Sequence, residues 1–223
     1  MSARNAPNSD AVLVVGLGRF GSSIAEALTA LGHEVLALDR SPALVQEWSG
    51  RLTHVVEADS TSEDALRQVG ASDFQVAIVG IGTSVEASVL TTAVLVDLGV
   101  KQIWAKALTA SHGKILSRIG ATNVVFPERD AGNRVAHLVS GRMMDYMEFD
   151  DDYAIVKMRP PRETQGFTLG ESKIRQMYGV TVVGVKRPGK DFTYAVPETR
   201  ISSNDLLIVS GQAQLIERFA ARR

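Results

Sequence analysis

The residues best suited to chemistry lie in the segment VLVVGLGRFGSSIAEAL, which covers positions 12 to 28. Gly16, Gly18 and Gly21 have the G-x-G-x-x-G spacing that shapes a backbone around the phosphates of a nucleotide. The first glycine permits a tight turn, the second lets a phosphate approach the backbone, and the third lets the next helix pack closely. Free N–H groups at the start of that helix attract the anion. The segment predicts a nucleotide site, either for an enzyme's cofactor or for a regulatory ligand.

Acidic residues follow the next two segments that have strand character. Asp39 ends EVLALD, 18 residues after Gly21, where a carboxylate can accept hydrogen bonds from ribose hydroxyls. Its alternative role is to cap the helix that follows. Asp59 and Ser60 come after the third strand and are candidates for the edge of the base, with capping of a helix at 61–69 as the alternative.

Charged residues near the same strand ends could contact phosphates. Arg19 lies inside the glycine turn, where a guanidinium would clamp a terminal phosphate, although it could also be a solvated surface arginine. Lys106 ends QIWAK and could point into the cleft. Glu128 and Asp130 flank Arg129 in FPERD, where they either complement a helix dipole or help to hold a hard cation.

The chain offers little for catalysis. It has no cysteine, no Walker lysine, no nucleophile elbow and no paired carboxylates at a convincing spacing. A dehydrogenase would have to position a substrate and a proton donor against its nicotinamide. All of the histidines precede the C-terminal region, and no two have metal-ligand spacing; they are His33, His54, His112 and His137. We therefore predict no catalytic residues, with a small NAD-dependent oxidoreductase as the alternative.

The first part of the chain alternates β-branched runs with amphipathic stretches. This alternation predicts a doubly wound, Rossmann-like parallel sheet with helices on both faces. Strands are expected at 11–15, 34–38, 53–56, 75–79, 102–106 and 122–126, and helices near 20–31, 41–49, 61–69, 84–98 and 110–119. Gly32, Gly70, Gly99 and Gly120 stand where helices should stop.

The remainder of the chain has a different pattern. Pro127 opens PERDAGNRVAHLVSGRMMDYMEF, whose apolar spacing predicts one long helix, and the acidic run at 150–152 indicates a boundary. Strands, a hairpin turn at RPGKD and a closing helix at QAQLIERFAARR then predict a small α+β domain. The expected domains are 10–128 for nucleotide binding, 129–149 for a crossover helix and 150–223 for a regulatory domain.

Composition excludes several classes of protein. The 223 residues carry 24 basic and 25 acidic side chains, a net charge of −1, so no overall field attracts nucleic acid or anionic lipid. No apolar run approaches the ~20 residues that cross a bilayer. Residues 1–10 lack the apolar core of a signal peptide and indicate a polar leader. We expect a cytoplasmic protein that reaches a membrane only through a partner.

With these motifs assembled, the chain resembles the cytosolic regulatory subunits of Ktr/Trk-type potassium uptake systems, which carry an RCK (KTN) domain. The similarity runs from about residue 10 to 219 and includes VVGLGRFGSSIA, HEVLALD, IGTSVEASVLTT, IWAKA, IGATNVVFPERDAG and YGVTVVGVKRPG. It implies an N-terminal Rossmann-like RCK_N domain and a C-terminal RCK_C domain. It also implies a homo-octameric ring, a tetramer of dimers, that gates a membrane potassium channel subunit.

The resemblance also implies ligands. ATP or ADP, with NAD(H) as an alternative, would bind at the glycine turn. Arg19 would contact the γ-phosphate across a dimer. Glu128 would contribute to a cation site for Mg, Ca or Na. The expected nucleotide-binding set is Gly16, Leu17, Gly18, Arg19, Phe20, Gly21, Asp39, Arg40, Asp59, Ser60, Ile81, Gly82, Lys106 and Glu128. Relatives bind cyclic di-AMP between C-terminal domains, where Arg175 matches a ligand residue, whereas Arg187 replaces the relatives' histidine. A third hypothesis is a redox-sensing transcription regulator, but neither a basic helix nor a helix-turn-helix segment is evident in the sequence to support it.

Overall fold

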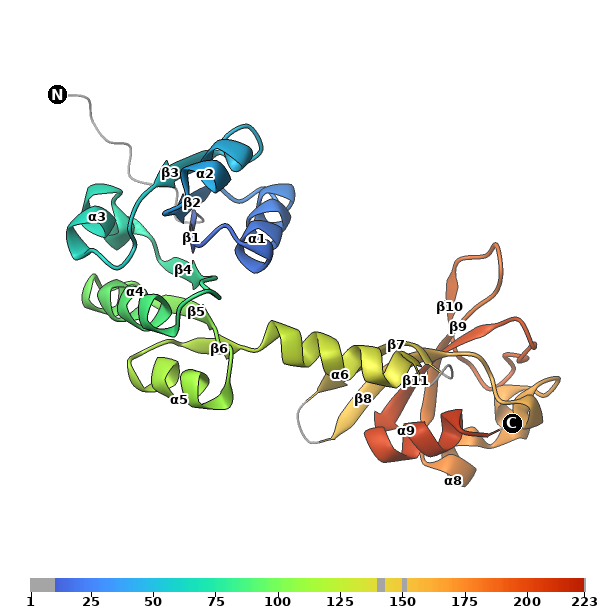
Figure 1. The fold of residues 1–223 in the computed structure, drawn as a ribbon. Coiled ribbons are helices and arrows are strands. Elements are labelled where there is room, and N and C mark those ends of the chain that lie inside the picture. The colour runs from blue at the N-terminus through green and yellow to red at the C-terminus, as the bar shows by residue number, and fades with distance from the viewer. Residues whose placement is uncertain (1–10, 140–142, 150–151, 223) are drawn as a thin grey trace. The chain divides into compact units, whose positions relative to one another are not determined.

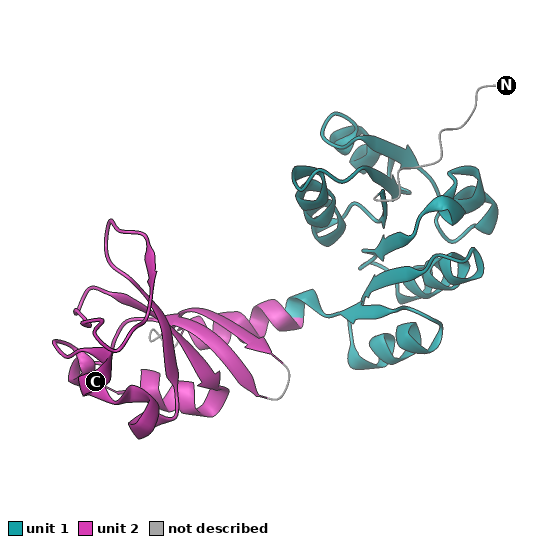
Figure 2. Ribbon diagram, turned by 180° about the vertical axis from the view of Figure 1, so that it is seen from behind, with its two compact units in different colours: residues 1–128 teal, residues 129–223 magenta. Residues whose placement is uncertain are grey.

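The structure is a computed structural model that describes residues 11–139, 143–149 and 152–222 (Figure 1). The chain divides into two compact units, residues 1–128 and 129–223 (Figure 2). The polar leader at 1–10 and two of the three residues of the acidic run, 150 and 151, lie outside the described residues.

The first unit contains a six-stranded parallel sheet with strand order β3-β2-β1-β4-β5-β6. This order confirms the predicted Rossmann-like fold, because the chain reverses direction across the sheet between β1 and β4. The strands are β1 (Val12–Val15), β2 (Val35–Asp39), β3 (His54–Glu57), β4 (Val76–Val79), β5 (Gln102–Lys106) and β6 (Asn123–Val125).

Helices alternate with these strands as predicted. They are α1 (Arg19–Ala30), α2 (Pro42–Trp48), α3 (Glu63–Gln68), α4 (Val85–Asp97) and α5 (Ala110–Arg118), with a short 3-10 turn at Ala71–Asp73. Ser62, Ser84 and Thr109 each accept a hydrogen bond from the backbone N–H three residues ahead, which begins α3, α4 and α5. Left-handed glycines follow helices as expected, at Gly32, Gly70, Gly99 and Gly120.

The central strand β1 is buried on both faces of the sheet. Leu13 and Val15 belong to a core cluster on one face, and Val12 and Val14 belong to a cluster on the other. Alternate residues of a strand point to opposite faces, so helices must cover both sides. This arrangement leaves the carboxyl ends of the strands as the open edge where a ligand can bind.

The second unit is built on a five-stranded antiparallel sheet with strand order β10-β9-β11-β8-β7. This confirms the predicted small α+β domain. Its strands are β7 (Met143–Phe149), β8 (Tyr153–Met158), β9 (Thr181–Lys186), β10 (Phe192–Tyr194) and β11 (Leu206–Gln212). Its helices are α6 (Pro127–Val139, which begins in the first unit), α7 (Leu169–Ser172), α8 (Ile174–Tyr178) and α9 (Ala213–Ala220), with a 3-10 turn at Arg162–Thr164.

The prediction of one helix through residue 149 is wrong. α6 ends at Val139, and Met143–Phe149 forms β7, which pairs antiparallel with β8. The strand changes register between Met143 and Asp145, and this irregularity lets Met143 and Tyr146, three residues apart, both be buried. A spacing of three imitates helical periodicity in the sequence. The methionines of this segment differ in exposure, because Met143 is buried while Met144 and Met147 are exposed.

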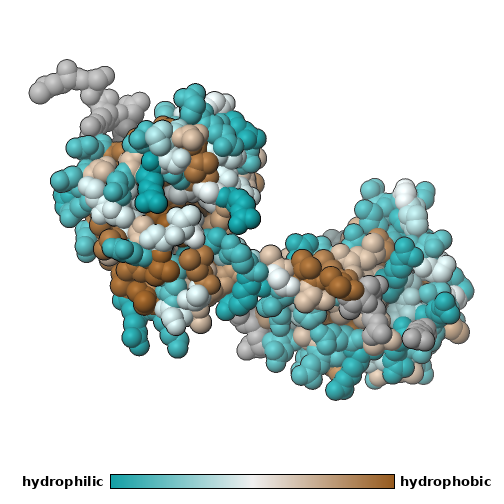
Figure 3. All heavy atoms as spheres, in the orientation of Figure 1, coloured by the Kyte–Doolittle hydropathy of each residue, from teal (hydrophilic) through white to brown (hydrophobic). Residues whose placement is uncertain are grey.

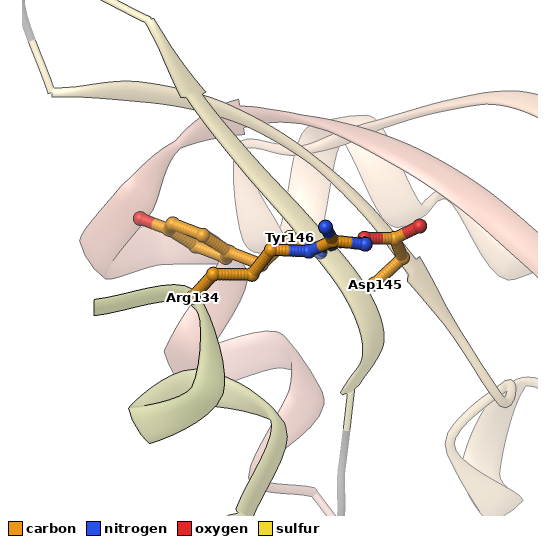
Figure 4. A network of polar contacts seen from close by, with 3 residues as sticks. All are labelled: Arg134, Asp145 and Tyr146. Atoms are coloured by element: carbon orange, nitrogen blue, oxygen red, sulfur yellow. Dashed lines mark hydrogen bonds and ion pairs between the residues drawn. The ribbon is translucent and has the colours of Figure 1, made fainter. Parts of the chain in front are cut away.

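The end of α6 is attached to β7 by polar contacts within the second unit. The Arg134 guanidinium donates to the Asp145 carboxylate from Nε at 3.1 Å and from Nη2 at 2.7 Å (Figure 4). The same oxygen accepts a hydrogen bond from the Tyr146 backbone N–H at 2.9 Å. The His137 ring stacks on the Tyr146 ring with centroids 3.8 Å apart. Helix and strand are thereby joined where a single helix was expected.

Candidate functional site

The glycine turn between β1 and α1 is fixed by close backbone packing. Gly16 has φ +93°, a conformation that side chains disfavour, and a Cβ on Gly21 would lie 1.9 Å from the Gly16 carbonyl oxygen. Gly80, at the end of β4, approaches the same turn, since its Cβ would lie 3.2 Å from Gly21 Cα. Glycine at these positions allows α1 to start directly against the sheet.

Gly18 has a different role from its neighbours. It is the N-cap of α1, it gives no side-chain cap, and a Cβ there would meet nothing within 4 Å. The first turn of α1 also contains no acidic residue. The helix therefore presents its N-terminal N–H groups and the positive end of its dipole to open space, as an anion-binding turn requires.

A pocket of about 280 Å³ lies at the carboxyl ends of β1, β2 and β4. This is where the strand order reverses, which is the place where doubly wound sheets bind their ligands. The pocket brings together many of the residues predicted from the sequence, namely Gly16, Gly18, Asp39, Arg40, Asp59, Ser60, Ile81 and Gly82. It does not include Leu17, Arg19, Phe20, Gly21, Lys106 or Glu128 among its lining residues.

Asp39 holds the glycine turn as well as facing the pocket. Its Oδ2 accepts a hydrogen bond from the Leu17 N–H at 2.7 Å, and its Oδ1 accepts one from the Ser41 N–H at 2.8 Å. Each carboxylate oxygen keeps a further lone pair that a ribose hydroxyl could use. The residue at the N-cap of α2 is Ser41, so Asp39 does not take the capping role that was its alternative.

Asp59 and Ser60 are oriented by their neighbours. Asp59 Oδ1 accepts from the Thr61 N–H at 3.0 Å and from its hydroxyl at 2.7 Å, and these bonds, helped by the charge of Arg40, lower the pKa of Asp59. Ser62 caps α3, so neither predicted residue is that helix's cap. The hydroxyl of buried Ser60 shares a hydrogen bond of 2.9 Å with Thr91 inside the unit.

Lys106 and Glu128 form an ion pair next to the pocket. Lys106 Nζ donates to Glu128 Oε1 at 2.6 Å and lies 5.7 Å from the centre of the Phe20 ring. The hydrogen bond from Lys106 lowers the pKa of the Glu128 carboxyl, and the charge of Arg19 adds to this effect. A Cβ on Gly82 would be 3.1 Å from Lys106 Nζ, so the ammonium lies directly beside a pocket residue.

The Arg19 side chain is exposed at the first position of α1. Within residues 11–139, 143–149 and 152–222 its guanidinium forms neither a hydrogen bond nor an ion pair, although it is close enough to Glu128 to influence that carboxyl. Leu17 and Phe20, also predicted to contact nucleotide, differ from it: Leu17 is buried in the core, and Phe20 packs against Lys106.

The described residues do not by themselves assemble the expected cation site. Among the described residues, no group of three or more His, Asp or Glu side chains could hold a metal ion. Glu128 is exposed over 63% of its side chain and is paired with Lys106. Any ion held by Glu128 would need further oxygen ligands, such as those of a phosphate, of water or of another copy of the chain.

The two arginines expected at a cyclic dinucleotide line different pockets of the second unit. Arg175 lines a pocket of about 330 Å³ beside α7 and α8, and its Nε donates to Thr181 Oγ1 at 3.1 Å. Arg187 lines another pocket, of about 350 Å³. One chain therefore does not bring these two side chains to one ligand.

Some lining residues of the N-terminal pocket were not among the predicted set. They are Val15, Leu38, Ser41, Leu44, Thr61, Gly80, Thr83 and Ala87. The signal for Gly80 was available, because this glycine directly follows the fourth predicted strand. Leu44 and Ala87 belong to α2 and α4, and only the packing of those helices brings them to the pocket.

Two domain models match the chain. Residues 12–127 match the TrkA-N domain, and residues 165–222 match the TrkA-C domain.

Within the described residues, none of the helices combines the length and the apolar character that crossing a bilayer requires.

Curated relatives align over nearly the whole chain. Ktr system potassium uptake protein C of Bacillus subtilis (strain 168) is 41% identical over 211 residues, which cover 94% of this chain and 95% of the relative. Ktr system potassium uptake protein A of the same organism is 36% identical, with 92% of this chain and 93% of the relative covered.

A solved structure has the same fold. The GsuK channel bound to NAD superposes with a TM-score of 0.69 at 19% identity, over 100% of this chain and 41% of that one. The chain thus spans less than half of that solved chain. At this identity the similarity shows the fold alone.

Proposed function

Because this chain belongs to the family of Ktr system potassium uptake proteins with TrkA-N and TrkA-C domains, we propose that it is a nucleotide-binding regulatory subunit that gates a membrane potassium channel. The relatives are named as potassium uptake proteins, and these names favour a role in potassium uptake over the alternative of a small oxidoreductase. The partner would be a membrane-embedded channel subunit, and this protein would act from the cytoplasmic side.

The observation that carries the proposal is the open N-terminus of α1 beside the pocket of the first unit. Gly18 leaves space over the helix start, and Asp39 stands across the pocket at the end of β2. Phosphates at the helix start and a ribose at Asp39 would use these two features together. Two proteins with a similar fold, the GsuK channel and the Shewanella denitrificans Kef CTD, have been solved with NAD and AMP bound, respectively, which supports a nucleotide in this place.

We assign ATP and ADP as the regulatory ligands, with NAD(H) as the competing choice. Arg19 is the reason, since its guanidinium has no partner among the described residues and lies next to the phosphate turn. A terminal phosphate carries more negative charge than the internal phosphates of a dinucleotide, and a guanidinium can bind it with two hydrogen bonds. A contact that ATP makes and ADP lacks is what allows one ligand to shift a conformational equilibrium.

Assembly into an octameric ring is part of the proposal. Figure 3 shows apolar surface over α4 in the first unit and over α6 in the second. Exposed apolar side chains include Val85 and Leu90 of α4, and Val135 and Val139 of α6, the last exposed over 78% of its surface. Contiguous apolar surface of this kind is typical of association sites. Glu128 would hold its cation between copies in such an assembly.

The test is calorimetric titration of the purified full chain with ATP, ADP and NADH. Binding of ATP or ADP, tighter than that of NADH, is the expected result, and light scattering should give the mass of an octamer. Tight NADH binding with no binding of either adenine nucleotide would contradict the ligand assignment. Turnover of NADH with a substrate would contradict the regulatory role itself. Cyclic di-AMP in the same titration tests the expected second ligand at Arg175.

A further inference from the structure

A second pocket with strong positive charge lies on the C-terminal unit. It has a volume of about 350 Å³, and its lining includes the cationic side chains of Arg159, Lys186 and Arg187. Asn204 adds an amide, and Met144 and Leu206 supply apolar surface. Neither the nucleotide site of the first unit nor Arg175 contributes to this pocket.

Strand pairing places two of the three cations in one row. Leu207 of β11 pairs with Met158 at the end of β8. Because the strands are antiparallel, the next residue, Arg159, comes opposite Leu206. On the other side of β11, Leu206 pairs with Lys186 of β9. Residues paired across neighbouring antiparallel strands project from the same face of a sheet. Arg159 and Lys186 therefore flank Leu206 on that face, and the backbone fixes their spacing.

The turn after β9 supplies the third cation. Lys190 donates its backbone N–H to the Arg187 carbonyl at 3.1 Å, and Gly189 has φ +68°, which a tight turn accepts easily. This turn joins β9 to β10 and holds Arg187 and Gly189 at the rim of the pocket. The turn hydrogen bond thus fixes the backbone from which the Arg187 side chain extends.

Among the described residues, these cations lack carboxylate partners. Across the described parts of the molecule, the side chains of Arg159, Lys186 and Arg187 form no ion pair, and no Asp or Glu appears among the described lining residues. Other arginines of the same unit behave differently, since Arg134 pairs with Asp145 and Arg222 pairs with Glu163. Three like charges around one hollow repel each other unless an anion enters it.

We propose that this pocket binds a phosphoryl group of a small ligand or a lipid headgroup, as a site separate from the nucleotide pocket. Two guanidinium forks and one ammonium match the several oxygens and the multiple charge of a phosphate better than the single charge of a carboxylate. Leu206 and Met144 would contact the apolar part of the molecule that carries the phosphate.

The test measures the acylation rate of individual lysines in the full chain by mass spectrometry, with inorganic pyrophosphate as the probe. Lys186 lines the pocket, and Lys190, exposed on the same turn but outside the lining, is the internal control. With pyrophosphate at ten times its dissociation constant, about one site in ten stays free, so acylation of Lys186 should slow about tenfold. Because the readout is local, pyrophosphate bound at the glycine turn does not affect it.

The variant Arg159→Gln should remove most of the protection of Lys186. The control Lys157→Gln, in β8 just before Arg159 and outside the lining, should retain it. The proposed site would be overturned if acylation slowed equally at Lys186 and Lys190. It would also be overturned if no phosphate source slowed acylation of Lys186. Equal protection by succinate would overturn the phosphoryl class.

Vesicles of phosphatidylcholine with phosphatidic acid form the second arm of the experiment. Protection of Lys186 by these vesicles assigns a lipid headgroup as the ligand. Protection by pyrophosphate, with no protection by the vesicles, assigns a soluble phosphate.

Discussion

The carboxylate of Asp39 accepts a hydrogen bond from the backbone N–H of Leu17 at 2.7 Å. An acidic residue at the end of β2 thereby fixes the glycine turn that joins β1 to α1. In the proposed function the same carboxylate binds ribose, so one side chain both shapes the phosphate turn and contacts the sugar. This double role makes Asp39 more sensitive to substitution than a residue that only touches the ligand.

Replacement Asp39→Ala should weaken both stability and nucleotide binding. It removes the acceptor for the Leu17 and Ser41 N–H groups, which should cost about 1–3 kcal/mol of unfolding free energy. Urea unfolding without nucleotide measures that loss, and calorimetry should show at least about tenfold weaker ATP binding from loss of the ribose contact. Glu47→Ala, an exposed acid on α2, is the control and should change neither quantity.

Two glycines of the turn should separate folding from binding. Gly21→Ala puts a Cβ 1.9 Å from the Gly16 carbonyl oxygen, so we expect a loss of several kcal/mol or failure to fold. Gly18→Ala has free space for its Cβ and should keep the thermal midpoint while weakening nucleotide binding. A Gly18→Ala protein that binds ATP with unchanged affinity would show that no phosphate approaches the helix start.

Arg19→Ala should weaken ATP binding more than ADP binding, because only ATP has a γ-phosphate for the guanidinium. A charge-assisted contact of about 1.5–3 kcal/mol corresponds to a roughly tenfold to hundredfold loss for ATP. The control is Lys101→Ala, which also removes one positive charge. Lys101 directly precedes β5 and so lies at the amino ends of the strands, away from the pocket at their carboxyl ends. Equal losses for ATP and ADP would contradict the assignment of Arg19 to the terminal phosphate.

The Lys106–Glu128 pair should give an acid-sensitive contribution to stability. Contact with Lys106 lowers the pKa of Glu128 in the folded protein, so the contribution is complete above the unfolded value of 4.5 and is lost as pH falls through the lower folded pKa. Thermal midpoints of the wild type and Glu128→Gln should therefore differ at pH 7 and converge under acidic conditions. A difference that is independent of pH would exclude this linkage.

Tyr146 should contribute a loss of stability at alkaline pH. Burial, with help from Glu148, raises its pKa from 10.0 to about 12. The unfolded chain then releases the phenolic proton before the folded chain does, so the unfolding free energy should fall as pH rises from 10 to 12. In Tyr146→Phe this fall should be smaller, because the remaining change comes from other tyrosines such as Tyr178. Chemical unfolding at several pH values provides the measurement.

Local signals in the sequence determined much of the first unit. Periodic apolar runs, glycines after helices and the G-x-G-x-x-G spacing each act over a few residues, so they can be recognised without tertiary contacts. They sufficed for the parallel sheet, for the edge at which the ligand pocket lies, and for Gly16, Gly18 and Asp39 as residues lining it. The motif resemblance supplied the family, and the domain matches and the Ktr relatives agree with it.

Only the tertiary structure decided the features that depend on residues distant in the chain. Pairing with β8 and a shift of register made Met143–Phe149 a strand although its spacing imitates a helix. The Asp39 bond to Leu17 and the Lys106 pair with Glu128 each join residues 22 positions apart. The row of Arg159, Leu206 and Lys186 comes from the register of three strands. Sequence patterns fix local conformation, whereas the partners of a polar side chain follow from packing, which no local pattern encodes.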